Sequence, residues 1–84
     1  MDKTFFIEVG QVVKSKAGRD IGEIFLVYEV LDDNYVLIVD GKTRKLNKPK
    51  KKKIKHLMIY KDIVNLKVDN LNDSYVRKSL KIYS

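Results

Sequence analysis

The stretch that decides the fold runs from Val9 to Gly41 and reads VGQVVKSKAGRDIGEIFLVYEVLDDNYVLIVDG. Valine, isoleucine and aromatic residues form short runs in it, separated by polar residues and glycines, as in β-strands joined by turns. The pattern predicts strands at residues 9–15, 23–30 and 35–39. Gly18 and Gly22 fall in the first connection, where the backbone needs positive φ or close approach.

The second predicted strand is apolar on both faces. Alternation places one set of side chains on one face and Phe25 and Val27 on the other; the first set is Ile24, Leu26, Tyr28 and Val30. A strand of this kind has little surface left for solvent. We therefore expect a sheet wrapped into a small barrel, with one side covered by an added segment.

Asp40-Gly41 predicts a hairpin after the third strand. This dipeptide suits a type I′ turn, whose two central residues both need positive φ. A fourth strand would then cover residues 42–46. Pro49 interrupts the ladder because proline has no N–H to donate, so we expect a polar loop at 47–52 and a fifth strand at 53–59.

The last part of the chain has the pattern of a helix. Val76, Leu80 and Tyr83 share one helical face, and Asn72 is a suitable N-cap. Leu71 has the spacing of a hydrophobic staple with Val76. The pattern predicts a helix over about 72–83, whereas residues 61–69 are equally compatible with strand, coil or a helical turn.

The expected fold class is mainly β: a five-stranded SH3-like barrel with a short C-terminal α-helix. The 84 residues suffice for one domain, with the barrel at 1–60 and a helix-bearing extension at 61–84 packed on it. Without cysteine the chain forms no disulfide or thiolate metal site. It has neither a signal-peptide pattern nor an apolar run of membrane-spanning length, so we expect a cytoplasmic protein.

Charge is concentrated in one segment. Residues 41–56, GKTRKLNKPKKKKIKH, hold half of the 18 basic residues and none of the 11 acidic ones. One interpretation is a solvated, flexible run; the other is a surface for a polyanion. Segregated charge and predicted strands on both sides favour the second. Because lysine outnumbers arginine, the segment suits phosphates better than base edges.

Residues 9–41 resemble the KOW motif of ribosomal and transcription-elongation proteins. Within that group the chain is similar to the fourteen-e family of large-subunit ribosomal proteins and its small bacterial relatives. The resemblance implies a KOW-type barrel and RNA binding, mostly to ribosomal RNA. The matching residues are Gly10, Val13, Ser15, Gly18-Arg19-Asp20, Gly22 and Asp40-Gly41.

The candidate RNA-binding residues are the cations of the first loop and of the basic segment, which in such barrels can lie on one side. They are Lys14, Lys16, Arg19, Lys42, Arg44, Lys45, Lys48, Lys50, Lys51, Lys52, Lys53, Lys55 and His56. Gly18, Gly22 and Gly41 are expected to serve the loop backbone, with phosphate approach as the alternative for the first two. His56 is a packed or RNA-facing residue sooner than a metal ligand. Whether Tyr35 and Tyr60 pack or stack on bases stays open.

The predicted function is an RNA-binding module. Its partner would be ribosomal or other structured RNA, with ribosomal proteins as further partners, and the free protein would be a monomer. The alternative is a protein-interaction module of the transcription or translation machinery. Membrane binding is disfavoured because no apolar residue accompanies the lysines at 50–53. We expect no enzyme, cofactor or metal, since no nucleophile, base and orienting group occur together.

Overall fold

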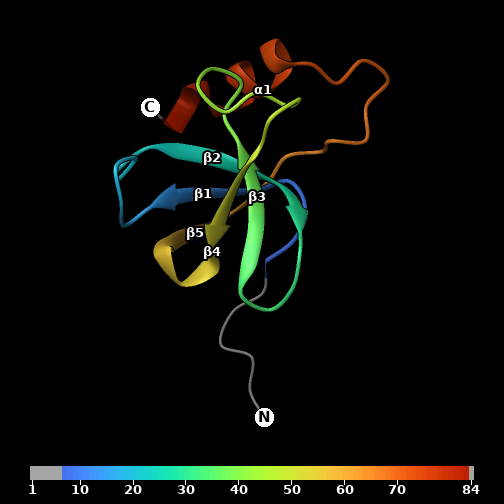
Figure 1. The fold of residues 1–84 in the computed structure, drawn as a ribbon. Coiled ribbons are helices and arrows are strands. Elements are labelled where there is room, and N and C mark those ends of the chain that lie inside the picture. The colour runs from blue at the N-terminus through green and yellow to red at the C-terminus, as the bar shows by residue number, and fades with distance from the viewer. Residues whose placement is uncertain (1–6, 84) are drawn as a thin grey trace.

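A computed structural model describes residues 7–83 and shows one antiparallel sheet with a short helix against it (Figure 1). Loops and turns join the first four strands, a 3₁₀ helix joins β4 to β5, and the order in the sheet is β4-β3-β2-β1-β5. The strands are β1 (Gln11–Ser15), β2 (Ile24–Val30), β3 (Tyr35–Val39), β4 (Lys50–Lys53) and β5 (Leu57–Ile63). The helical elements are η1 (Ile54–His56), α1 (Asp73–Leu80) and η2 (Lys81–Tyr83).

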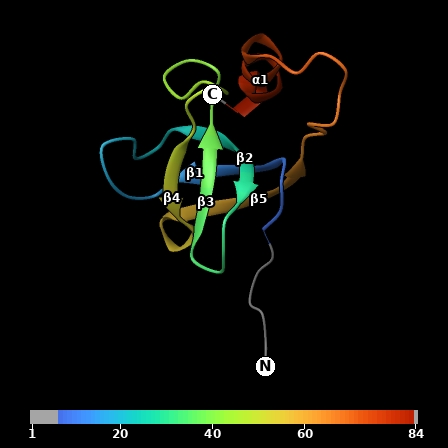
Figure 2. The same ribbon diagram turned by 45° about the vertical axis from the view of Figure 1, so that its right-hand side comes forward.

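The sheet curls around one of two apolar clusters. Val13, Phe25 and Ile38 point into this inner cluster, and Ile54 and Leu57 close it between β4 and β5. All five are at most 4% exposed. The strands cross at steep angles around this core (Figure 2). The mainly β class, the five strands and the barrel-like form are confirmed.

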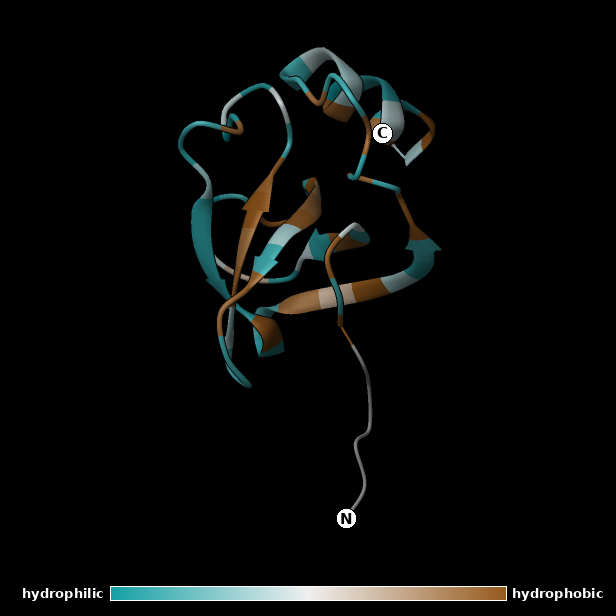
Figure 3. Ribbon diagram, turned by 90° about the vertical axis from the view of Figure 1, so that its right-hand side faces the viewer, coloured by the Kyte–Doolittle hydropathy of each residue, from teal (hydrophilic) through white to brown (hydrophobic). Residues whose placement is uncertain are grey.

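The second cluster lies on the outer face of the sheet, beneath the helix. Val12, Leu26 and Val39 meet Val76 and Leu80 of α1 there. Val76 and Leu80 are the buried residues of the helix, which lies beside the sheet in Figure 3. This explains why β2 is apolar on both faces: one face fills the barrel and the other receives the C-terminal segment.

Helix α1 begins where its sequence predicts. The side chain of Asn72 accepts a hydrogen bond of 2.8 Å from the N–H of Tyr75, as an N-cap does. Leu71 packs in the same outer cluster as Val76. The α-helix ends at Leu80 and continues as η2, so the expected span of 72–83 is divided between two helix types. Of the open segment 61–69, β5 takes the residues up to Ile63 and the rest is coil with a turn.

The fourth and fifth strands were predicted in the wrong places. Residues 42–46 form no strand; β4 is residues 50–53, and β5 runs over 57–63 instead of 53–59. Gly41 has φ of 78°, but no non-glycine residue among those described has positive φ, so Asp40-Gly41 is not a type I′ turn. The carboxylate of Asp40 instead accepts hydrogen bonds from the N–H groups of Lys42 and Arg44. The chain therefore forms a wide loop here instead of a tight hairpin.

This β3–β4 loop, residues 40–49, is fastened to the helix. Arg77 donates from Nη1 to the carbonyl of Gly41 at 2.7 Å, and the N–H of Leu46 donates to Asp73 at 2.8 Å. A Cβ at position 41 would lie 2.5 Å from the carbonyl oxygen of Asp73, so only glycine permits this approach. The loop and α1 therefore hold each other in place.

Candidate nucleic-acid interface

Strand β4 consists of four lysines whose side chains alternate between two environments. Lys50 and Lys52 pair with Ile38 and Val36, residues of the inner cluster. Lys51 and Lys53 pair with Leu37 and Tyr35 and are exposed. Since successive side chains of a strand point to opposite faces, the run is divided between the barrel and the solvent.

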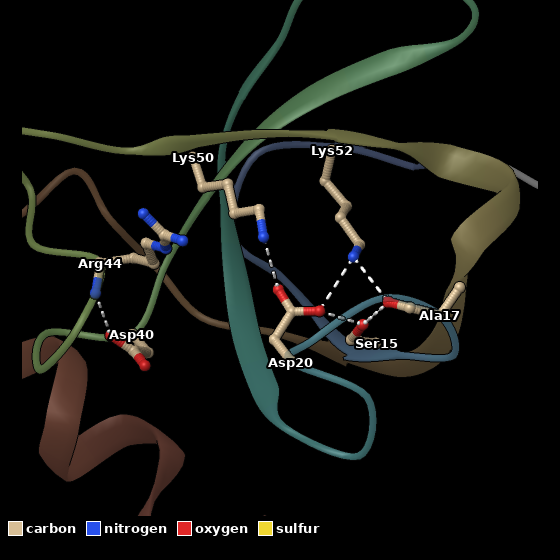
Figure 4. A network of polar contacts seen from close by, with 7 residues as sticks. All are labelled: Ser15, Ala17, Asp20, Asp40, Arg44, Lys50 and Lys52. Atoms are coloured by element: carbon tan, nitrogen blue, oxygen red, sulfur yellow. Dashed lines mark hydrogen bonds and ion pairs between the residues drawn. The ribbon is translucent and has the colours of Figure 1, made fainter.

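The two inward lysines share one carboxylate. Nζ of Lys52 lies 2.9 Å from Oδ1 of Asp20, and Nζ of Lys50 lies 3.1 Å from Oδ2 (Figure 4). Lys52 also donates to the carbonyl of Ala17, and Ser15 donates from Oγ to Asp20 at 2.7 Å. Lys52 is only 7% exposed. A buried ammonium group that is hydrogen-bonded to a carboxylate and a carbonyl in this way serves the fold.

Asp20 is kept ionised by these partners. Burial acts to raise the pKa of its carboxyl group, but hydrogen bonds from Ser15, Lys52 and Lys50 outweigh burial and hold the pKa well below its ordinary value of 3.8. The carboxylate thus remains charged at neutral pH and neutralises part of the lysine run.

The first loop, residues 16–23, lies against β4 and η1. Asp20 and Ala17 contact the lysines of β4, and the N–H of Lys16 donates to the carbonyl of His56 at 2.8 Å. The structure therefore brings Lys16 next to η1, and both Lys16 and Arg19 are exposed in this loop. Gly18 and Gly22 adopt φ of 87° and 89° here.

Six exposed lysines form what we call the basic strip. Its members extend along β4 from the loop fastened to α1 down to η1 at the other end. Among residues 7–83 the ion pairs are those of Asp20, so none of the strip is neutralised in that way. The basic strip comprises Lys42, Lys45 and Lys48 of the loop, Lys51 and Lys53 of β4, and Lys55 of η1.

Other predicted site residues lie elsewhere. Lys14 is half-buried on β1 between its pairing partners Ile24 and Met58, three strands from β4 in the sheet order. Lys50 and Lys52 turn inward. Arg44 and His56 are half-buried beside the strip. Gly41 acts through its contact with the helix.

The sequence did not reveal the role of Asp20. In the sequence Asp20 is one residue of the Gly18-Arg19-Asp20 motif, whereas in the structure it is the carboxylate that joins the first loop to β4. The sequence does indicate that such a residue is needed. If four consecutive lysines pair with the apolar β3, the lysines on the inward face require a negatively charged partner. Only the fold shows which acidic residue, 30 and 32 positions away, provides it.

The described residues contain neither a metal-binding cluster nor a membrane-spanning helix. Within 7–83 no three side chains of histidine, cysteine, aspartate or glutamate gather in a way that would hold a metal ion. No helix in this part of the chain has the length and apolarity needed to cross a bilayer.

Comparison with known proteins identifies the family. The chain is 31% identical over 75 residues to large ribosomal subunit protein eL14 of Hyperthermus butylicus, covering 89% of this chain and 76% of that protein. The chain belongs to the eL14 family. The eL14 protein of Desulfurococcus amylolyticus is 37% identical over 51 residues, which are 61% of this chain and 53% of that protein. No protein-family model matches the chain. The expected likeness to the fourteen-e family is confirmed.

Proposed function

We propose that this eL14-family protein associates with the ribosome in the cytoplasm and binds RNA through the basic strip. Both relatives are named as proteins of the large ribosomal subunit, which supports the ribosomal context. The observation that supports RNA contact is the display of six exposed lysines, without ion-pair partners among the described residues, along one strand and its two flanking segments.

The basic strip suits phosphates by its chemistry. Ammonium groups are compact, strongly hydrated charges that attract phosphate oxygens but do not read base edges in a bidentate way. Lys16 and Arg19 extend the same field from the first loop. The recognition would therefore follow the course and shape of the RNA backbone more than its sequence.

The fold prepares the strip for binding. Strand β4 is fixed by pairing with β3 and by the contacts of Asp20, and the β3–β4 loop is fastened to α1. Holding the lysine backbone in place before RNA arrives reduces the conformational entropy lost on binding. The inward lysines thus contribute indirectly, by positioning the outward ones.

A salt titration tests the proposal. Binding of the full chain to large-subunit ribosomal RNA is measured across salt concentrations for the wild type and for a triple variant, Lys45→Gln, Lys48→Gln and Lys53→Gln. The control removes the same charge from exposed lysines that are not part of the strip: Lys61→Gln, Lys67→Gln and Lys78→Gln.

Each phosphate contact contributes roughly 0.7 to 0.9 to the slope of log affinity against log salt. The magnitude of that slope should therefore fall by about two to three in the strip variant and by much less in the control variant. Equal losses in the two variants would mean that only net charge matters, and the strip would not be the contact surface. Failure of the wild type to sediment with large ribosomal subunits in dilute buffer would remove the ribosomal association.

A further inference from the structure

A small pocket opens at the end of the barrel opposite α1. It lies between the β2–β3 turn and η1, which both views show close together at that end (Figures 1 and 2). Its volume is about 300 Å³, at the small end of the range for ligand sites. The lining residues are Asp33, Asn34, Tyr35, Lys53, Ile54 and Lys55.

Hydrogen bonds fix the walls of this pocket. The N–H of Ile54 donates to the carbonyl of Asn34 at 2.8 Å, joining η1 to the turn. Within the turn, Oδ1 of Asp32 accepts from the N–H groups of Asn34 and Tyr35, each at 2.8 Å. Because its two sides are tied together, the pocket exists before any ligand arrives.

The lining combines three kinds of group. Tyr35 offers a half-buried aromatic ring, and the ammonium group of Lys51 lies over one face of that ring, 4.5 Å from its centroid, so a base would stack on the other face or displace Lys51. Lys53 and Lys55 are exposed cations of the basic strip. The exposed turn residues Asp33 and Asn34 add a carboxylate and an amide. An aromatic surface bordered by cations and by hydrogen-bonding groups matches the parts of a nucleotide: base, phosphate and polar base edge.

We propose that this pocket receives one unpaired nucleotide of the RNA that the basic strip binds, with its base against Tyr35 and its phosphate at Lys53 and Lys55. The inference rests on the proposed function and refines it. A pocket of this volume holds one nucleotide and excludes a paired duplex. The carboxylate of Asp33 repels phosphate and accepts from base N–H groups, which orients the base toward the turn.

Two RNA probes with equal charge separate base contact from phosphate contact. Both are heptamers of abasic ribose phosphates; one has a single central adenine and the other has no base. Fluorescence anisotropy at low salt measures binding by the wild type, Tyr35→Phe, Tyr35→Leu and a control, Tyr75→Leu. Circular dichroism confirms that each variant is folded.

The wild type should bind the probe with a base at least about fivefold more tightly, as expected for one base stacked on an aromatic ring. Tyr35→Phe should keep this preference, Tyr35→Leu should lose it, and Tyr75→Leu should keep it. Equal binding of the two probes by the wild type, or a preference that survives in Tyr35→Leu, would overturn the pocket assignment. Salt-dependent binding of both probes in that case would leave the proposed function standing, whereas no binding to these probes or to ribosomal RNA would end both.

Discussion

Nζ of Lys52 lies 2.9 Å from Oδ1 of Asp20, and this pair joins an edge strand to a loop 32 residues earlier in the chain. The lysine in the middle of the most basic segment is therefore a structural residue. Its ammonium group donates to Asp20 and to the carbonyl of Ala17, and its backbone pairs with Val36 of the inner cluster. The sheet is closed on this side by polar contacts.

Replacing the shared carboxylate should destabilise the fold. Asp20→Asn leaves the Lys52 ammonium group buried without a counter-charge, which should lower the free energy of unfolding by about 3 kcal/mol. Urea denaturation measures the change. Asp69→Asn, at an exposed position, should stay within about 0.5 kcal/mol of the wild type.

The double variant Asp20→Asn with Lys52→Met checks the cause. Removing the unpaired charge should recover part of the lost stability, because a methionine at position 52 needs no counter-charge. If the double variant is as unstable as the sum of the two single changes, the effect does not arise from a stranded ammonium group.

Low pH should remove the contribution of Asp20 to the stability of the fold. The pKa of Asp20 is lower in the folded chain than its ordinary value of 3.8, so the folded state favours the ionised form. The stabilisation is fully present above that ordinary value and is lost as the pH falls below it. The difference in unfolding free energy between wild type and Asp20→Asn should therefore shrink between about pH 4 and pH 2. A difference that stays constant over this range would contradict the ionic contribution.

Lys52 and Lys53 are neighbours in β4, but replacing each of them by glutamine should change a different property. The change at Lys52 should lower stability, and the change at Lys53 should reduce the salt dependence of RNA binding. Lys53→Gln should leave the unfolding midpoint in urea nearly unchanged and reduce the salt slope of RNA binding by roughly 0.7 to 0.9. Lys52→Gln should lower the midpoint, because Asp20 loses a buried partner, and should leave the slope of the folded protein unchanged. Identical behaviour of the two variants would mean that β4 does not alternate as described.

Alanine substitutions test how much the close contact between Gly41 and α1 contributes to stability. Gly41→Ala adds a Cβ 2.5 Å from the carbonyl of Asp73 at φ of 78°, so it suffers both overlap and backbone strain. Gly22→Ala has φ of 89° but meets no atom within 4 Å. Backbone strain alone should lower the free energy of unfolding by about 1–2 kcal/mol in both variants. Gly41→Ala should lower it further because of the overlap with Asp73. Equal losses in thermal or urea unfolding would show that the loop does not need its contact with α1.

The sequence predicts the first half of the chain well. The strands at 11–15, 24–30 and 35–39 follow from apolar alternation and β-branched residues, whose local preferences agree with the fold. The N-cap at Asn72 and the face of Val76 and Leu80 are likewise local patterns. Each of these predictions depends on residues close together in the chain.

The structure of the basic segment was predicted wrongly because it depends on residues that are far apart in the chain. Four consecutive lysines have little intrinsic preference for a strand, and β4 exists because β3 pairs with it and Asp20 provides charge from a distant loop. The turn at Asp40 was misjudged because its carboxylate binds the following backbone and its neighbour Gly41 packs on α1. The contacts of Gly41 with α1 and of Asp20 with β4 join residues far apart in the chain and leave no periodic trace, whereas the hydrogen bonds of Asp40 are local.

The position of β4 at one end of the strand order has a consequence for self-association. Among the described residues its outer edge pairs with no other strand, and such edges readily recruit a second copy of the same chain. Here two copies meeting edge to edge would set the exposed cations Lys51 and Lys53 of one copy against those of the other. The repulsion protects the protein from fibre-like stacking, and apolar replacements at Lys51 and Lys53 would remove that safeguard together with two cations of the strip.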